Sequence, residues 1–302
     1  MNPRPNFRFE ASESSPVIVA TDGREQSDGA LRAGALFGGS VDAWRVVSAS
    51  QLINNLAPEF DFGITAEAIE VLREEQLRLV QDQIRRVLGE ASDIDLEIGA
   101  GDPALVVAAF AANRNAALVV AGLGRHRVVD RLLGDETALA IIRASAKPVL
   151  AVPQDFADVP RSAVVGVDFS DPSICAAQLA LRIAQDAATI YLVNVAPREN
   201  VLDALDGGLR AYEQRARSEL ELAASRLDVP PRMHVQPVVR QGDPGSELLR
   251  YAEEVHAELI AVGTRGQGFL ARLLLGSVAT KIIRASPIAV LTIPTRDADK
   301  DR

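Results

Sequence analysis

The stretch Ile141-Ile-Arg-Ala-Ser145 occurs a second time as Ile282-Ile-Arg-Ala-Ser286, 141 residues further along the chain (from 141 to 282). A second motif, Gly101-Asp-Pro103, recurs with the same offset as Gly242-Asp-Pro244 (from 101 to 242). Two motifs that keep both their order and their spacing are typical of a duplicated structural unit. The sequence therefore indicates that one unit is present twice in the chain.

The start of each copy and the linker between the copies can also be recognised. Val17-Ile-Val-Ala-Thr-Asp22 matches Ala163-Val-Val-Gly-Val-Asp168, with the aspartate displaced by 146 residues (from 22 to 168). The change of offset requires a gap, which we place near the second strand or second helix. The segment Pro153-Gln-Asp-Phe-Ala-Asp-Val-Pro160 carries a proline at each end, which disfavours a continuing helix or strand. We therefore predict domains over residues 1–156 and 157–302.

Composition places the chain among globular proteins. It has 302 residues, of which 48% are hydrophobic, 24% charged and only 4% aromatic. These fractions exclude a largely disordered chain and predict cores built from Ala, Val, Leu and Ile. The formal net charge of −9 argues against a general nucleic-acid-binding protein, because such proteins present a basic surface.

Several chemistries are disfavoured by residues that are rare or badly spaced. Cys175 is the single cysteine, so no disulfide forms within the chain, and its spacing in a predicted helix places it in the core. His126, His234 and His256 lack metal-ligand spacing, which predicts no metal site. The N-terminus has no signal-peptide pattern, and apolar stretches such as Ala104–Ala112 fall short of the ~20 residues that span a bilayer. We expect a soluble, cytoplasmic protein without membrane association.

Each copy reads as strands alternating with helices. The apolar strands predicted in the first copy lie near residues 16–21, 41–48, 93–99, 116–121 and 148–152. In the second copy strands are expected at 162–167, 189–195, 234–240, 258–262 and 288–293, and helices at 171–185, about 201–227, from 244 and from about 277. Strands that are apolar on both faces indicate parallel sheets. The predicted fold is α/β, with two tandem doubly wound, five-stranded parallel sheets (Rossmann-like), whose binding crevices lie at the carboxyl ends of the strands.

Two aspartates precede prolines at the expected starts of helices. Asp102-Pro103 and Asp243-Pro244 place a good N-cap residue before a proline that suits the first helical turn. We therefore predict that both aspartates cap helices, with direct ligand binding as the alternative.

A glycine-rich loop follows the fourth strand of the second copy. It reads Gly263-Thr-Arg-Gly266-Gln-Gly268-Phe-Leu-Ala-Arg272-Leu-Leu-Leu-Gly276-Ser277. Glycines let backbone amides approach an anion closely, and a helix N-terminus adds unpaired N–H donors and a positive dipole end. This pattern favours a nucleotide phosphate, with the Ser277 hydroxyl either capping the helix or donating to phosphate. The alternative is an ordinary connector with a serine N-cap, and Arg272 is then a solvated residue rather than a phosphate-facing one.

Other nucleotide-binding patterns are missing from the sequence. There is no G-x4-G-K-[ST] segment, which argues against a P-loop NTPase. Neither copy has G-x-G-x-x-G after its first strand, which argues against a dinucleotide-binding enzyme.

The loop pattern G-x2-G-x9-G-[ST] resembles the ATP-binding signature of the universal stress protein family, and the similarity extends over nearly the whole chain, twice. Asp168 after the first strand, Gly242-Asp-Pro244 and the closing strand Ser286-Pro-Ile-Ala-Val-Leu291 support the resemblance. A tandem member of that family is therefore suspected. In ATP-binding relatives the aspartate lies beside the nucleotide, and the glycines and serine hold the phosphates and ribose.

The resemblance implies a nucleotide site in the second copy and names its residues by motif position. They are Val167, Asp168, Val262, Gly263, Gly266, Gly276, Ser277 and Val278, with Val195 bordering the adenine. The implied ligand is ATP, with or without Mg²⁺, although AMP and cyclic AMP stay open.

The first copy departs from this pattern in its loop, Ala121-Gly-Leu-Gly124-Arg-His-Arg-Val-Val-Asp-Arg-Leu-Leu-Gly134-Asp-Glu-Thr137. Gly124 and Gly134 align with the second and third loop glycines, but Ala121 then replaces the first one. Alternatively, Gly122 aligns with Gly263, and Gly134 is lost from the motif.

In both alignments the phosphate position of the first copy is altered. Asp135 and Glu136 lie where phosphate is expected, and two like charges ~4 Å apart cost roughly 1 kcal/mol in water. Arg125, Arg127 or a bridging Mg²⁺ would offset part of that repulsion. We therefore expect weak nucleotide binding in the first copy, at Asp22, Gly124 and Gly134, and the main site in the C-terminal domain.

The resemblance also sets the expected function. No residue is positioned as a general base or nucleophile beside the expected γ-phosphate, so we predict a nucleotide-dependent stress-response regulator rather than a dedicated enzyme. The alternatives are a slow ATPase or autophosphorylating enzyme, and a nucleotide-free stress scaffold. The expected partners are an adenine nucleotide, an unidentified regulatory protein and a second copy of the chain. Relatives associate through their last strands, here Pro148–Val152 and Ile288–Ile293, which would pair within the chain or in a homodimer.

Overall fold

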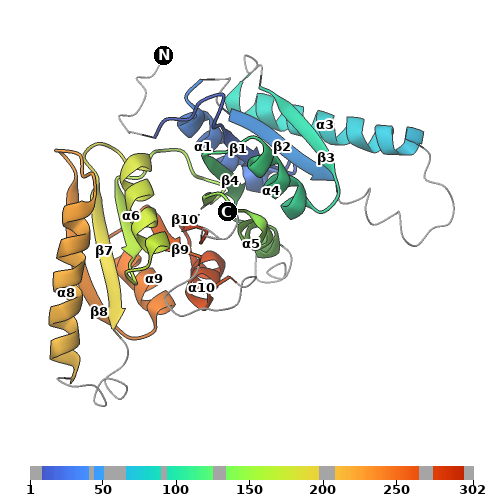
Figure 1. The fold of residues 1–302 in the computed structure, drawn as a ribbon. Coiled ribbons are helices and arrows are strands. Elements are labelled where there is room, and N and C mark those ends of the chain that lie inside the picture. The colour runs from blue at the N-terminus through green and yellow to red at the C-terminus, as the bar shows by residue number, and fades with distance from the viewer. Residues whose placement is uncertain are drawn as a thin grey trace, which may run out of the picture. The chain divides into compact units, whose positions relative to one another are not determined.

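The computed structural model describes residues 9–40, 44–50, 66–89, 94–124, 134–196, 208–264 and 275–295. It divides into two compact units, of which the first contains Glu10–Asp158 and the second contains the chain from Val159 onward. Figure 1 shows that each unit is a parallel sheet with helices packed against it.

The first unit contains five strands in the order β3-β2-β1-β4-β5, and each neighbouring pair is parallel. Its elements in chain order are β1 (Val17–Ala20), the 3-10 helix η1 (Glu25–Ser27), α1 (Asp28–Gly38), β2 (Trp44–Ser50), α3 (Ala66–Leu88), β3 (Leu96–Ala100), α4 (Pro103–Asn113), β4 (Leu118–Gly122), α5 (Gly134–Ala144) and β5 (Val149–Val152).

The second unit repeats this arrangement with the strand order β10-β9-β6-β7-β8, again parallel throughout. Its elements are β6 (Ser162–Gly166), α6 (Asp171–Ile183), β7 (Thr189–Ala196), α8 (Gly208–Arg226), β8 (His234–Gln241), α9 (Pro244–Glu254), β9 (Leu259–Gly263), α10 (Ser277–Ala285) and β10 (Ala289–Ile293). The fold class predicted from the strand and helix pattern is confirmed.

The chain direction across each sheet decides which helices share a face. Strands β1, β2 and β3 follow one another toward one edge, whereas β4 and β5 lie on the other side of β1. Because crossovers between parallel strands are right-handed, α1 and α3 cover one face and α4 and α5 cover the other. The packing agrees, since α1 contacts α3 and α4 contacts α5, while α9 contacts α10 in the second unit.

The cores are aliphatic, as the low aromatic content predicts. Strands β1, β4, β5, β9 and β10 are buried almost throughout, with side chains of Ala, Val, Leu and Ile. Covering both faces of these strands with helices removes their apolar side chains from water.

The two predicted helix caps are confirmed. The Asp102 carboxylate accepts hydrogen bonds from the backbone amides of Ala104 and Leu105, at 2.8 and 3.2 Å. The Asp243 carboxylate accepts one from the Ser246 amide at 2.9 Å. Each cap satisfies amides that have no partner inside the helix.

The prediction that Cys175 belongs to the core is wrong, because its side chain is exposed. Helix α6 buries Ser173, Ala176, Ala177 and Ala180, which recur at three and four residue spacings. A residue two positions from both Ser173 and Ala177 lies on the opposite side of that stripe.

Candidate functional site

The aspartate after β6 is held by its own loop. Val167 continues the strand pairing, since its amide donates to the Val193 carbonyl at 2.9 Å. Asp168 Oδ1 then accepts hydrogen bonds from the Ser170 amide at 3.1 Å and from Ser170 Oγ at 2.5 Å. Asp168 is thereby fixed at the carboxyl edge of the sheet, where the sequence predicts it.

The residue after Asp168 has an unusual backbone. Phe169 has a φ of +63°, in the left-handed region that bulky residues avoid. This conformation costs roughly 1–2 kcal/mol and persists only when the surrounding structure holds it. The turn after β6 is therefore a strained one, and such turns cluster at ligand sites.

A buried asparagine ties the ends of β6 and β7 together. Asn194 Nδ2 donates to the Val167 carbonyl at 2.8 Å, and Tyr212 on α8 donates its hydroxyl to Asn194 Oδ1 at 3.1 Å. Burial raises the pKa of the Tyr212 hydroxyl above its usual value, so it stays a donor. Sequence reasoning missed both residues, although an asparagine inside the apolar strand was a readable signal.

The start of α10 is fastened to the end of β9. The Thr264 amide donates to the Ile293 carbonyl at 2.8 Å, and the Gly276 amide donates to the Thr264 carbonyl at 2.8 Å. Gly276 is the N-cap of α10, and because it is glycine, no N-cap side chain satisfies the first amides of the helix. Ser277 is the first helical residue and is exposed.

The predicted residues of the second unit come together at this edge. Val167 and Asp168 follow β6, which lies between β9 with Val262 and Gly263 and β7 with Val195. Gly276, Ser277 and Val278 lie at the start of α10. Gly266, together with Gly268 and Arg272, lies outside the described residues. The binding role of these residues stays a prediction.

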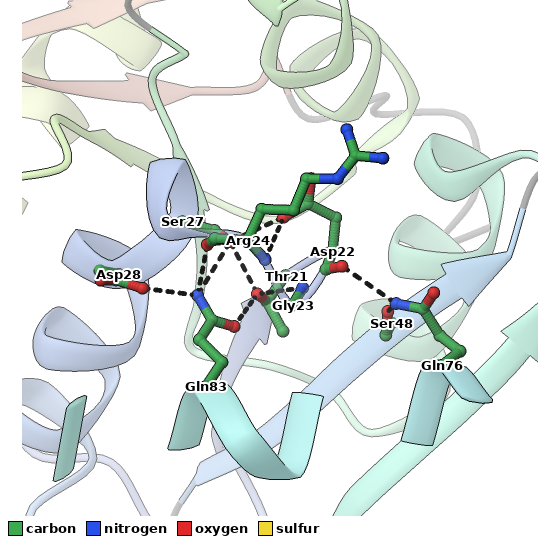
Figure 2. Close-up of polar contacts among 9 residues, drawn as sticks. All are labelled: Thr21, Asp22, Gly23, Arg24, Ser27, Asp28, Ser48, Gln76 and Gln83. Carbon is green, nitrogen blue, oxygen red and sulfur yellow. Dashed lines mark hydrogen bonds and ion pairs between the residues drawn. The ribbon is translucent and has the colours of Figure 1, made fainter. Parts of the chain in front are cut away.

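In the first unit the corresponding edge is covered by polar side chains from α3 (Figure 2). Thr21 Oγ1 donates to Gln83 Oε1 at 2.6 Å and lies 2.8 Å from Ser27 Oγ. Asp22 Oδ1 accepts from the Arg24 amide at 3.1 Å and from Ser27 Oγ at 2.9 Å.

Gln83 is the centre of this network, and its side chain is 1% exposed. Gln83 Nε2 donates to the Arg24 carbonyl at 2.6 Å and to Asp28 Oδ1 at 2.9 Å. Arg86 binds both carboxylate oxygens of Asp28, at 2.5 and 2.9 Å. Burial raises the pKa of Asp28, but the hydrogen bonds from Arg86 and Gln83 outweigh it and leave that pKa below its usual value.

A second glutamine of α3 reaches the ends of two strands at once. Gln76 Nε2 donates to the Asp22 carbonyl at 3.1 Å and to Ser48 Oγ at 2.9 Å. Gln76 and Gln83 are seven residues apart (from 76 to 83), so they lie on one face of the helix. Sequence reasoning missed Ser48 in β2. It also missed Gln76 and Gln83, because polar residues on a highly charged helix are expected to face solvent.

The structure favours one of the two loop alignments. Strand β4 ends at Gly122 as β9 ends at Gly263, and the next residues, Leu123 and Thr264, donate to the last strand of their own sheet, at 2.6 and 2.8 Å. The offset of 141 (from 122 to 263) also holds for the repeated motif after the loop, so Gly122 aligns with Gly263. Gly134 is the first residue of α5, whereas Gly276 precedes α10. Residues 125–133 and the side chains of 134–136 lie outside the described structure, and binding at Asp22, Gly124 and Gly134 stays a prediction.

Two further observations concern other kinds of site. Among the described residues, no group of three or more His, Cys, Asp and Glu side chains is placed to hold a metal ion. No described helix combines the length and the apolar character needed to cross a membrane.

Comparison with known proteins identifies the family. The model of the universal stress protein family matches residues 14–153 and again residues 161–294. A universal stress protein of Mycolicibacterium smegmatis is 23% identical over 295 residues, covering 93% of this chain and 97% of the relative. One from Methanocaldococcus jannaschii is 31% identical over 142 residues, covering 44% of this chain and 81% of the relative.

A solved structure that matches nearly the whole chain agrees with the fold. The crystal structure of a universal stress protein from Archaeoglobus fulgidus matches with a TM-score of 0.66 and 20% identity, over 94% of this chain and 99% of that one. A further universal stress protein was solved in complex with cAMP; it covers 46% of this chain and 100% of its own, with a TM-score of 0.34 and 26% identity. With two family matches that together extend over most of its length, the chain belongs to the universal stress protein family.

Proposed function

We propose that the second unit binds ATP at the carboxyl edge of β6, β7 and β9, and that the protein is a nucleotide-dependent stress-response regulator. The observation that carries this proposal is the hydrogen bond from the Gly276 amide to the Thr264 carbonyl, at 2.8 Å. It holds the N-terminus of α10, whose first amides are satisfied by no N-cap side chain, against the end of β9. Amides and helix dipole together favour an anionic phosphate at that point.

The neighbouring strand ends supply an apolar place for the base. Val195 is half-buried and leaves some aliphatic surface at this edge, whereas Val167 and Val262 are buried. Pockets that combine apolar walls with a few fixed polar groups are typical of small-molecule sites. The strained turn at Phe169 lies directly beside this surface and supports the same location.

The residues present suit binding better than catalysis. Asp168 Oδ1 is engaged by two groups of Ser170, and the described residues around it offer no metal-binding cluster. Mg²⁺, when it accompanies ATP, would therefore be held mainly by the phosphate oxygens and water. Nucleotide binding would then alter the surface offered to a regulatory partner, and the homodimer implied by the family resemblance stays a prediction.

Calorimetric titration of the full chain with ATP, AMP and cyclic AMP tests the proposal, with two matched variants at Gly276. This residue has φ −61° and ψ 152°, which any residue adopts, so substitution there does not strain the backbone. Both Asp and Asn are good N-caps, so Gly276→Asp and Gly276→Asn both cap α10, and only the first adds a charge. We expect Gly276→Asp to weaken ATP binding at least about tenfold more than Gly276→Asn.

Three outcomes would contradict the proposal. Equal affinity in wild type and Gly276→Asp would show that the phosphates lie elsewhere. If the purified wild-type protein carries no nucleotide and ATP does not raise its melting temperature, the protein is a nucleotide-free scaffold. Steady phosphate release that Asp168→Ala abolishes would make it an enzyme.

A further inference from the structure

The loops after the first strand of each unit are built alike. Ser27 Oγ donates to the Arg24 carbonyl at 2.9 Å, and Ser173 Oγ donates to the Ser170 carbonyl at 2.8 Å, with an offset of 146 (from 27 to 173). The same offset relates Asp22 to Asp168. The edge that we propose to bind ATP in the second unit therefore has a clear counterpart in the first.

The two edges differ in what satisfies their polar atoms. In the second unit Asp168 is bound by its own loop, and the end of β6 is bound by Asn194 from the adjacent strand. In the first unit the Thr21 hydroxyl and the Asp22 carbonyl are bound by Gln83 and Gln76, which come from the covering helix α3. Figure 2 shows both glutamine side chains pointing from α3 into this corner.

A glycine lets α3 approach this closely. A Cβ added to Gly23 would lie 3.0 Å from Leu79 Cβ and 3.2 Å from the Leu79 carbonyl carbon. At the matching position, with the same offset of 146 (from 23 to 169), the second unit has Phe169, which carries a large side chain instead of a hydrogen. The helix over the first unit is therefore packed onto the turn itself.

Gln76 offers a hydrogen-bond donor of the kind that adenine carries. The NH₂ group of its planar carboxamide donates to the Asp22 carbonyl and to Ser48 Oγ across β1 and β2. The exocyclic amine of adenine is a donor of the same kind. A base at this edge would have to displace Gln76 and also push aside Leu79.

We infer that α3 is a built-in occupant of the first unit's nucleotide edge, with Gln76 taking the hydrogen bonds of a base, so that each chain carries one adenine-nucleotide site. This inference rests on the proposed function for the position of that edge. It differs from the explanation offered by the loop sequence, in which Asp135 and Glu136 repel the phosphates. The two barriers are separable by mutation, because α3 would exclude the base, whereas Asp135 and Glu136 would repel the phosphates.

The first experiment restores the loop and then removes the occupant. By the offset of 141, Asp135→Gly with Glu136→Ser recreates the Gly276-Ser277 pair of the second unit. Titrated in a Gly276→Asp background that disables the second site, this loop-restored chain is expected to bind no ATP. Adding Gln76→Ala and Leu79→Ala, both at half-buried or exposed positions, is expected to produce binding of about one equivalent.

Two results of that experiment overturn the inference. ATP binding by the loop-restored chain with α3 intact would mean that the helix leaves the edge open. No binding after the helix substitutions would mean that Gln76 and Leu79 are not what excludes the base.

The second experiment needs no nucleotide. We expect Gln76→Ala to speed hydrogen exchange of the α3 amides around residues 73–80 by at least about fivefold, since their fastening is lost. Gln214→Ala, at an exposed glutamine of α8, is the matched control and should leave α8 exchange unchanged. Unchanged exchange in α3 overturns the inference. If the wild-type chain binds no ATP, the proposed function fails, and this measurement still decides whether Gln76 fastens α3 to the edge.

Discussion

The loops around Asp22 and Asp168 occupy matching positions in the two copies, yet their polar groups have different hydrogen-bond partners. Around Asp168 the described contacts come from Ser170 of the same loop and, at the Val167 carbonyl, from Asn194 of the adjacent strand, which Tyr212 of α8 holds in turn. Around Asp22 they are made over a separation of more than fifty residues, by Gln76 and Gln83 of α3. On our inference, the helix that covers the first unit's edge closes it, while the loop keeps its own hydrogen bonds, such as those that Asp22 and Asp168 accept from the amides two residues later.

The closed corner is stabilised by groups that water cannot reach. Asp28, Ser27 and Gln83 are each less than one tenth exposed, and each is hydrogen-bonded to the others or to Arg86. Buried polar networks stabilise a fold when every member has a partner, and they destabilise it when one partner is removed. The Asp22 corner should therefore respond to mutation much more strongly than the Asp168 corner.

The largest effect is expected from Asp28→Ala. This change leaves the half-exposed Arg86 guanidinium and the buried Gln83 carboxamide without their carboxylate, and removing the buried, charged acceptor that both share costs about 3 kcal/mol. Urea denaturation of the two-unit chain, fitted to two transitions, measures the loss in the first unit. The control is Asp171→Ala, an exposed aspartate of α6, which should change the free energy of unfolding by less than about 0.5 kcal/mol. If both variants lose equal free energy of unfolding, the hydrogen-bond network around Asp28 does not stabilise the first unit.

A smaller effect is expected from Gly23→Ala. Both Gly23, with φ +83°, and Gly89, with φ +89°, have left-handed backbones, so alanine costs about 1 kcal/mol at either position. A Cβ at Gly23 also meets Leu79 at 3.0 Å, whereas nothing lies within 4 Å of one at Gly89. We expect Gly23→Ala to lower the free energy of unfolding by about 2–3 kcal/mol, and the difference from Gly89→Ala isolates the packing of α3 on the turn. If the two variants lose equal free energy of unfolding, α3 moves away from the added Cβ at little cost.

In the Asp168 corner, Tyr212→Phe should cost about 1 kcal/mol. The change removes the hydroxyl that donates to Asn194 Oδ1 at 3.1 Å and leaves that buried oxygen unsatisfied. Tyr191→Phe is the same chemical change at a hydroxyl that has no hydrogen-bond partner among the described residues, and the Tyr191 ring keeps its edge-to-face contact with Tyr251. Its cost should be smaller, as measured by the same denaturation experiment. If the two variants lose equal stability, the Asn194 link contributes nothing.

Sequence patterns predicted the parts of this comparison that depend on local chemistry. Strands such as β4 and β9 are apolar runs bounded by glycine, and the Asp102 and Asp243 caps follow from an aspartate placed before a proline. The duplication itself was visible as repeated motifs. These features need no knowledge of which elements meet in space.

The Gln76 and Gln83 contacts could not be predicted in this way. Whether a glutamine of α3 points to water or into a turn depends on the rotation of the helix about its axis and on the missing side chain at Gly23. The wrong prediction for Cys175 has a related cause, because helical spacing alone does not show which side of α6 packs against the sheet. The residue types of α3 and α6 are known from the sequence, but the surface against which each helix face packs is not.

The smallest expected effect is the pH dependence of the Asp243 helix cap. Asp102 caps the matching helix of the first unit, but only Asp243 is bound by Lys281. Hydrogen bonds from Lys281 and Ser246 lower the pKa of Asp243 to about 2, from 3.8. A carboxyl group whose pKa is lowered on folding stabilises the protein above its unfolded pKa, and that contribution is lost as the pH falls from about 4 toward about 2. Asp243 is 49% exposed, so the contribution is screened and stays below about 1 kcal/mol.

Asp243→Asn tests this, because asparagine keeps the cap but does not titrate. We expect the variant to lose less stability than wild type between pH 6 and pH 3 in urea denaturation. In the first unit, Ala140 and Leu105 take the places of Lys281 and Ser246, with an offset of 141 (from 140 to 281), and no ammonium group of the described residues pairs with Asp102. Asp102→Asn should therefore change the loss of stability between pH 6 and pH 3 less than Asp243→Asn does. If the two variants shift it equally, the pH response belongs to helix capping in general, and Lys281 does not distinguish the two units.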